Sequence, residues 1–268
     1  MTRTTSFLCV AALGLMACNK VPYTDRKQLN VIPGGIMNAA GAQTYSATLA
    51  EVQVRTGDDD VKTLKRVGGR ISKVANQPKF DWQYNLLDDP TVNAWCLPGG
   101  YIGFYSGILP TLKNESGMAF VMGHEVGHAV AKHGAERLSQ QIGVIGGLTV
   151  IEAWIQGKSK LTPEQKAALF GALGLGAEVG VLLPFSRLHE SEADVIGMMY
   201  MADSGYPPEE STEVWVRMGQ LGGEKPPTFL STHPSDEQRI KNLNKWMPQA
   251  KKKYLRNKLQ GDVTSDRW

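Results

Sequence analysis

The spacing of apolar residues predicts a chain built mostly of helices. Between residues 36 and 77, apolar side chains recur at intervals of three or four, the repeat of one helix face. They are Val61, Leu64, Val67, Ile71 and Val74. Similar spacing predicts helices over 115–141, from Leu188 onward, after Pro207-Pro208, and from about Asp236 to the basic C-terminal residues.

Residues 80–109 depart from helical spacing. This segment, FDWQYNLLDDPTVNAWCLPGGYIGFYSGIL, is rich in aromatic and β-branched residues and is broken by Asp-Asp-Pro and Pro-Gly-Gly. Such a pattern predicts two or three antiparallel strands. The chain is therefore expected to have an α+β, mostly helical fold with a small antiparallel sheet.

The apolar, glycine-rich region 142–185 has two interpretations. Its first part, 142–155, is too short to span a bilayer. Its second part, 167–185, is long enough but contains Glu178 and Pro184. We favour helices buried inside the domain, with membrane insertion as the alternative.

The N-terminus predicts export. Arg3 precedes an apolar run that ends at Ala17, a pattern typical of a signal peptide and too short to span a membrane. Leu15-Met16-Ala17-Cys18 resembles a bacterial lipobox, which implies cleavage before Cys18 and a lipid on its thiol. An ordinary signal peptide with a coincidental cysteine is the alternative. If the sorting rule is enterobacterial, Asn19 implies the outer membrane, and the protein would face the periplasm.

These features divide the chain into four parts. We expect a signal peptide over 1–17, a lipidated tether over 18–35, one domain over 36–250 and a basic tail over 251–268. Hydrophobic residues make up 42% of the chain, enough to build a core. After processing and acylation Cys96 is the one remaining thiol, so no disulfide framework is expected, and this cysteine is predicted to be a small buried side chain.

The charge balance excludes one class of partner. With 29 basic and 26 acidic residues, the net charge of +3 gives no concentrated basic face for nucleic acid. Lys251-Lys252-Lys253 is interpreted as a solvated helix end, with weak attraction to anionic lipid as the alternative.

Three of the five histidines fall within GHEVGHAVAKH on a predicted helix. Residues four apart on a helix differ by about 40° in direction, so His124 and His128 point toward a common site. His133 lies about 140° round from His128 and is expected to cap the helix or face solvent. Glu125 lies about 100° from His124, beside a bound ion, where it can take a proton from water.

This H-E-x-x-H pattern is typical of zinc sites that keep one position open. Metzincins place a third histidine six residues after the second, but here that residue is Gly134. Glu190 is the strongest candidate for the third ligand, because Asp194 lies on the same helical face and can accept the free N–H of a ligand histidine. Glu192 is a rival ligand, and a solvated acidic helix is the alternative for the whole segment.

GHEVGHAVAKHG, followed by Glu190 and Asp194, resembles the HtpX/Oma-like gluzincin zinc peptidases, relatives of the CAAX prenyl protease and of the periplasmic proteases BepA and LoiP. The stretch 93–102 is similar to the family's strand beside the active-site cleft, with Gly107-Ile108-Leu109 closing it. Residues 231–234, Ser-Thr-His-Pro, followed by Arg239-Ile240, are similar to its C-terminal segment. The resemblance covers roughly residues 45–245 and implies a zincin-like domain with the sheet beside the active-site helix. The absence of a pair of clear spanning segments favours the lipid-tethered or periplasmic branch.

The resemblance also implies roles for single residues. One zinc ion would be held by His124, His128 and Glu190, with Asp194 supporting a ligand histidine. Glu125 would act as general base and then as general acid.

A further donor to the oxyanion is needed, and His233 is the first candidate, with Arg239 second. In some relatives the corresponding histidine instead occupies the open position on the metal and keeps the enzyme inactive. A structural loop histidine is the remaining alternative for His233.

The predicted function is that of a zinc endopeptidase acting on unfolded or misassembled proteins of the bacterial cell envelope, bound to the membrane by its lipid. Tyr101, Ile102 and Gly103 are expected to bind extended peptide through a free strand edge, unless the strand is paired on both sides. The alternative function is a chaperone-like periplasmic lipoprotein that binds clients and seldom cuts them. Glu125 favours the enzyme, since a pure binder has no chemical need for that carboxylate. A zinc hydrolase of another bond is weaker, because nothing indicates a phosphate or sugar site.

Overall fold

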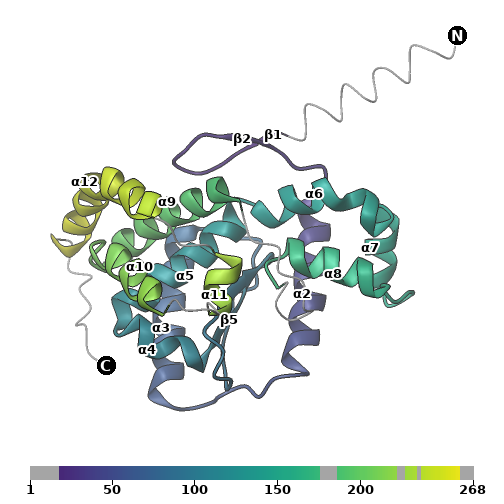
Figure 1. Cartoon of the computed structure of the whole chain (residues 1–268), viewed down its shortest axis with the longest axis horizontal. Coiled ribbons are helices and arrows are strands. Elements are labelled where there is room, and N and C mark those ends of the chain that lie inside the picture. Colours follow the sequence, from purple (N-terminus) through teal and green to yellow (C-terminus); the bar gives the residue numbers. More distant parts are fainter. Residues whose placement is uncertain (1–17, 176–185, 222–226, 234–236, 260–268) are drawn as a thin grey trace, which may run out of the picture.

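The computed structural model describes residues 18–175, 186–221, 227–233 and 237–259. Its helices are α2 (Gly34–Leu49), α3 (Asp59–Ala75), α4 (Leu109–Leu112), α5 (Glu115–Val130), α6 (His133–Ile145), α7 (Leu148–Ile155), α8 (Pro163–Ala172), α9 (Arg187–Asp203), α10 (Glu210–Gln220), α11 (Thr228–Thr232) and α12 (Glu237–Leu259), with a 3-10 turn η1 (Ser106–Ile108). Its strands are β1 (Cys18–Lys20), β2 (Lys27–Leu29), β3 (Gln83–Leu87), β4 (Ala94–Leu97) and β5 (Tyr101–Tyr105). The mostly helical α+β fold predicted from the sequence is confirmed (Figure 1).

Helix α5 lies at the centre of the molecule, with α9, α3, α10 and β4 packed around it (Figure 1). Every residue from Glu115 to His128 is buried, which explains why its apolar positions form no single stripe. The helix begins at a capping residue, Asn114, whose side chain accepts a hydrogen bond from the Gly117 N–H at 2.8 Å.

Glycines bring α5 and α9 unusually close together. A Cβ added at Gly197 of α9 would lie 2.6 Å from the backbone nitrogen of His124, and one at Gly123 would lie 2.8 Å from the Gly197 carbonyl oxygen. Only residues without a side chain permit this approach. Because the two backbones nearly touch, short carboxylate side chains on α9 reach the histidines of α5.

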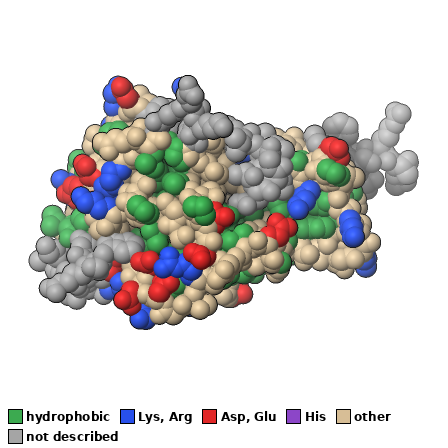
Figure 2. All heavy atoms as spheres, turned by 60° about the horizontal axis from the view of Figure 1, so that its bottom comes forward, with side chains coloured by type: hydrophobic (Ala, Val, Ile, Leu, Met, Phe, Trp, Pro, Cys, Tyr) green, Lys and Arg blue, Asp and Glu red, His purple; other side chains and the backbone are tan. Residues whose placement is uncertain are grey.

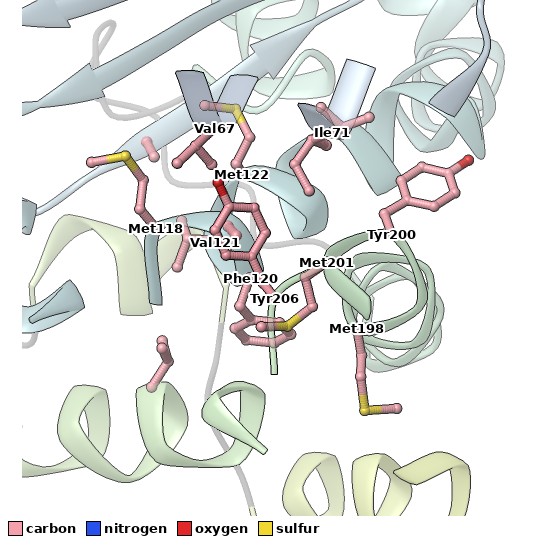
Figure 3. Packing of buried hydrophobic residues seen from close by; sticks show 14 of the residues in the cluster. Val67, Ile71, Met118, Phe120, Val121, Met122, Met198, Tyr200, Met201 and Tyr206 are labelled. Carbon is pink, nitrogen blue, oxygen red and sulfur yellow. The ribbon is translucent and has the colours of Figure 1, made fainter. Parts of the chain in front are cut away.

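The main core surrounds this crossing. Figure 3 shows side chains of α5 packed between those of α3 and those of α9. Met118, Phe120 and Met122 are fully buried, and so is Tyr206, which follows α9. A second apolar cluster joins α2, α6, α7 and α8 to the sheet. Helix α5 is therefore held in place by packing on several sides.

The sequence predicts two or three antiparallel strands between residues 80 and 109; the structure has three there, and the sheet is mixed. Its order is β3-β5-β4, with β3 parallel and β4 antiparallel to β5. Pro98-Gly99-Gly100 joins β4 and β5 in a hairpin, as its sequence suggests. The β3–β4 connection is fixed instead at the far end of β5, because Asp89 exchanges hydrogen bonds with Ser106 and accepts one from the Gly107 N–H. The chain therefore leaves β3, crosses the position that β5 will later occupy, and forms β4 on the far side of it.

The helix expected over 115–141 is interrupted. Helix α5 ends at Val130 and α6 begins at His133, because Lys132 adopts a left-handed conformation with φ of 59°. The region 142–175 forms the end of α6, then α7 and α8, with Ile151 and Leu169 buried as expected. Residues 176–185 lie outside the described residues. In the described part of the chain, no helix combines the length and the apolar character needed to cross a membrane.

Both terminal segments, assigned from the sequence to a tether and a tail, contain regular structure. The hairpin of β1 and β2 packs on the domain, with Val21 buried in the main core. At the other end, α12 continues through Leu259, so residues 251–259 are helical. Lys253 pairs with Asp203. Figure 2 shows acidic and basic side chains interspersed on the face it presents, in keeping with the balanced charge.

Candidate metal centre

Four buried side chains converge from three parts of the chain. His124 and His128 come from α5, Glu190 from the first turn of α9, and His233 from the end of α11. One potential ligand atom from each lies within 4.8 Å of all the others. The pairing of the H-E-x-x-H histidines with Glu190, predicted from the sequence, is what the structure shows.

The distances fit a tetrahedral ion. The Nε2 atoms of His124 and His128 are 3.1 Å apart and lie 3.5 and 3.4 Å from the Glu190 carboxylate oxygens. Zinc ligands at about 2.0–2.1 Å in a tetrahedron stand about 3.3 Å from one another. Burial holds the pKa of His128 well below its usual value, so its ring is neutral and offers a lone pair. The donor set of imidazoles and one carboxylate is a zinc set.

Asp194 holds His124 from behind. Its Oδ1 lies 3.0 Å from the His124 Nδ1, which leaves Nε2 of that ring to face the site. Trp215 donates to the same oxygen at 3.1 Å, and Arg239 donates to both carboxylate oxygens at 2.7 Å. Burial alone would raise the pKa of Asp194, but the Arg239 charge and these hydrogen bonds outweigh it and lower the pKa.

Arg239 also contacts the candidate ligand Glu190, at 2.7 Å. Burial raises the pKa of Glu190, but the nearby charges of His233 and Arg239 outweigh that effect and hold it well below the usual range. Arg239 is itself buried, tied to two carboxylates. Its position favours a role in orienting them over the oxyanion role considered as second choice from the sequence.

The sequence suggested that His133 caps the helix or faces solvent, and the structure shows that it does neither. The left-handed Lys132 turns the chain, so His133 is fully buried and its Nδ1 lies 2.9 Å from the Nδ1 of His128. Its Nε2 lies 3.1 Å from Glu192. Glu192, the rival ligand, therefore contacts His133 and stands outside the metal-binding group. Its pKa is about 2, because hydrogen bonds from His133 and Arg26 outweigh the effect of burial.

Glu125 stands beside the four candidate ligands. Its Oε1 is buried with no hydrogen-bond partner among the described residues and lies 3.5 Å from the His233 Nε2. Burial raises its pKa to about 7, which the His233 charge partly opposes. A carboxylate of that pKa can both take and return a proton near neutral pH.

The site opens into an apolar cleft of about 580 Å³. Glu125, His128 and His233 are among the residues that line it. Its apolar walls include Ile32, Met37, Trp95 and Leu173, all of them buried. The N-terminal segment after β2 thus forms part of the cleft, a contribution that the sequence gave no reason to expect.

The strand beside this cleft is β4, and the prediction of a free edge at Tyr101, Ile102 and Gly103 is wrong. β5 is the central strand and is paired on both sides. The Tyr105 N–H bonds the Asn93 carbonyl, and alternation along an antiparallel pair then turns the backbone groups of Cys96 away from β5. The Cys96 N–H accordingly bonds the Glu125 carboxylate. Cys96 itself is a buried thiol, as expected.

Comparisons with known proteins agree with this geometry. The sequence profile described as peptidase family M48 matches residues 59–247. The mitochondrial metalloendopeptidase OMA1 of Saccharomyces cerevisiae is 36% identical over 262 residues, which cover 88% of this chain and 71% of that protein. OMA1 of Schizosaccharomyces pombe is 32% identical over 87% of this chain and 67% of its own length. The putative beta-barrel assembly-enhancing protease of Vibrio cholerae is 26% identical over 89% of this chain, which spans about half (51%) of that relative.

The resemblance seen in the sequence motifs is thereby confirmed, and with it the assignment of zinc. The matched segment contains both helices that carry the histidines and carboxylates, together with the sheet and the His233 segment. Relatives with names of metalloendopeptidases match most of the chain. The chain belongs to peptidase family M48 and is a zinc metallopeptidase.

Proposed function

We propose that this protein is an endopeptidase that cleaves unfolded or misassembled proteins of the bacterial cell envelope, anchored through a lipid on Cys18 and facing the periplasm. The observation that carries the proposal is the position of Glu125. This carboxylate lines an apolar cleft, beside four convergent metal-binding groups and next to the edge strand β4. A binding protein would need the cleft but not the buried base.

His124, His128 and Glu190 are the proposed zinc ligands. Zinc bound there supplies Lewis acidity to the peptide carbonyl and to water. Glu125 takes the proton of the attacking water and passes it to the leaving amide nitrogen, for which its pKa of about 7 is suited. Asp194 keeps His124 oriented by accepting its Nδ1–H.

His233 lies close enough to act as a fourth ligand. Its Nδ1 is 3.2 Å from the His124 Nε2 and 3.1 Å from Glu190. With a metal held by the other three groups, His233 in this position would fill the place that substrate or water needs, and the enzyme would be in a resting state. Cleavage then requires that the His233 side chain move aside, and a shift within the cleft would bring it to the oxyanion as a donor.

The cleft supports the proposed substrate class. Cys96 of β4 turns its backbone carbonyl toward the cleft, where an extended peptide can add as a further strand. Main-chain pairing of this kind has little sequence preference, and the apolar walls accept large apolar side chains. Proteins that have not folded expose both extended backbone and apolar residues. A relative named as a beta-barrel assembly-enhancing protease supports the envelope as the setting.

The experiment is cleavage of casein, an unstructured protein, by the zinc-loaded chain that begins at residue 18. We expect cleavage near pH 7, lost on chelation and restored by zinc. The Glu125→Gln variant should bind zinc as the wild type does and cleave at least 10³-fold more slowly, because it keeps the ligands and lacks the base. If wild type and Glu125→Gln behave alike on casein and on envelope clients, the chaperone-like function is the correct one.

A second variant separates the two roles of His233. If this histidine mainly blocks the metal, His233→Ala should cleave casein faster than the wild type. If it mainly stabilises the oxyanion, the same variant should be slower by roughly 10²–10³ in kcat. We expect the faster enzyme, because His233 lies among the ligands in the resting arrangement.

A further inference from the structure

The N-terminal hairpin is joined to the metal centre by a continuous line of polar contacts, partly buried at Arg26 and fully buried at His133. Besides burying Val21, the hairpin places Tyr23 edge-on against Tyr200 of α9 at 6.3 Å between ring centroids. The Gln28 amide donates to the Ala131 carbonyl, at the break between α5 and α6. These contacts fix the hairpin beside the two helices that carry His128 and His133.

Arg26 is the residue of the hairpin that points toward the centre. Its Nε donates to Glu192 Oε1 at 2.8 Å, and its two terminal nitrogens donate to Glu136 at 2.9 and 2.8 Å. Thr24 donates to the same Glu192 oxygen at 3.1 Å. The other oxygen of Glu192 receives His133, so this carboxylate is shared between the hairpin and the histidine.

The order of protons along this line is determined by its two ends. If His128 binds metal through Nε2, its Nδ1 carries the hydrogen and must donate to the Nδ1 of His133, 2.9 Å away. His133 Nδ1 then carries no hydrogen, so its Nε2–H donates to Glu192. Glu192 accepts at both ends because Arg26 and Thr24 are donors only toward it. Each group has one role, and reversing either imidazole places two donors or two acceptors face to face.

We propose that Arg26 and Glu192 are positioning residues which, through His133, hold the ring of His128 in its metal-binding orientation. The N-terminal hairpin is thereby a working part of the metal centre and not a spacer between a membrane anchor and an enzyme. Mutation of a residue that accepts the free N–H of a ligand histidine typically lowers metal affinity by about 10–100-fold. Here the acceptor is an imidazole, whose own orientation depends on a residue more than a hundred positions earlier in the chain. The inference rests on the proposed role of His128 as a ligand.

The test measures zinc affinity by competition with a chromophoric chelator on the full chain from residue 18. Glu192→Gln keeps the shape but presents a donor to either His133 or Arg26, so we expect zinc affinity to fall about 10–100-fold. Arg26→Ala should lower it about tenfold, and Arg26→Lys should recover part of that loss. In the double variant Arg26→Ala with Glu192→Gln, the affinity should equal that of Glu192→Gln alone, because both act through one line of contacts. The visible spectrum of the Co²⁺-loaded protein should change in the same variants.

Arg66→Ala is the matched control. Arg66 also pairs with a buried glutamate, Glu115, which starts α5 but lies on no path to a metal-binding side chain. This variant should lose stability and bind zinc within twofold of the wild type. The proposal is overturned if Glu192→Gln and Arg26→Lys, both folded by circular dichroism, bind zinc within twofold of the wild type. Because the readout is metal affinity, it stands even if the wild type cleaves no casein, the result that would count against the proposed function.

Discussion

The two histidines of α5 are supported by two different regions of the molecule. On one flank, His124 donates to Asp194, which is bound by Arg239 and Trp215 within the core formed by α9, α10 and α12. On the other flank, His128 contacts His133, which contacts Glu192, and Glu192 in turn is bound by Arg26. A single carboxylate separates a ligand from a cation on the first flank, and two residues separate them on the second.

The two flanks also differ in depth. The side chains of Asp194 and Arg239 are 1% and 3% exposed, whereas that of Arg26 is 21% exposed. A charge interaction strengthens as water is excluded, and removing one partner of a buried pair leaves the other without compensation. Changes on the Asp194 flank should therefore affect both stability and metal binding more than changes at the hairpin. The comparison therefore ranks substitutions by their expected effect on stability and zinc affinity, and measurements on variants can test that order.

The largest effect is expected for Asp194→Asn. Arg239 would lose the charge of Asp194 and one of its two acceptor oxygens inside the core and would keep only Glu190 as a charged partner, which should lower the free energy of unfolding of the metal-free protein by about 3–5 kcal/mol. Zinc affinity should fall by about 10–100-fold, since the amide is a weaker acceptor for the His124 ring. Urea unfolding gives the first quantity, and chelator competition gives the second.

Asp203→Asn is the control on the same helix. Asp203 pairs with Lys253 in a partly exposed position at the far end of α9, and its loss should cost about 1 kcal/mol without changing zinc affinity. Equal losses for Asp194→Asn and Asp203→Asn would show that the buried flank is no more important than an ordinary surface pair.

The sequence allowed prediction of the Asp194 flank because its geometry is local. Four-residue spacing on a helix places His124 with His128, and the same spacing places Glu190 with Asp194. These relations depend only on helical geometry, and the structure preserves them. How closely the two helices approach depends on Gly123 and Gly197, whose packing role cannot be read from spacing alone.

The His128 flank could not be predicted in the same way. Its geometry depends on one left-handed residue, Lys132, in a segment whose apolar spacing continues through the break. It also depends on Arg26, in a stretch whose prolines and glycines indicated a tether. The parallel pairing of β3 with β5 was not predicted for a related reason, because the contacts of Asp89 that fix it are tertiary. Helical periodicity is encoded locally, whereas chain reversals and docking are decided by distant contacts.

The smallest effect is expected for Trp215→Phe, on the stronger flank. The indole N–H is one of several donors to Asp194, and its loss leaves His124 and Arg239 still bound to that carboxylate. Phenylalanine also keeps an aromatic face under the Arg239 guanidinium, which lies 3.7 Å from the ring centroid. We expect a loss of about 1–2 kcal/mol in unfolding free energy and zinc affinity within threefold of the wild type. Trp154→Phe removes the same atoms from a partly buried position on α7, away from any of these carboxylates, and gives a lower bound for the packing part of that loss. A fall in zinc affinity as large as that of Asp194→Asn would mean that the Trp215 N–H, and not the Arg239 charge, orients Asp194, and the ranking of the flanks would then follow hydrogen-bond geometry instead of buried charge.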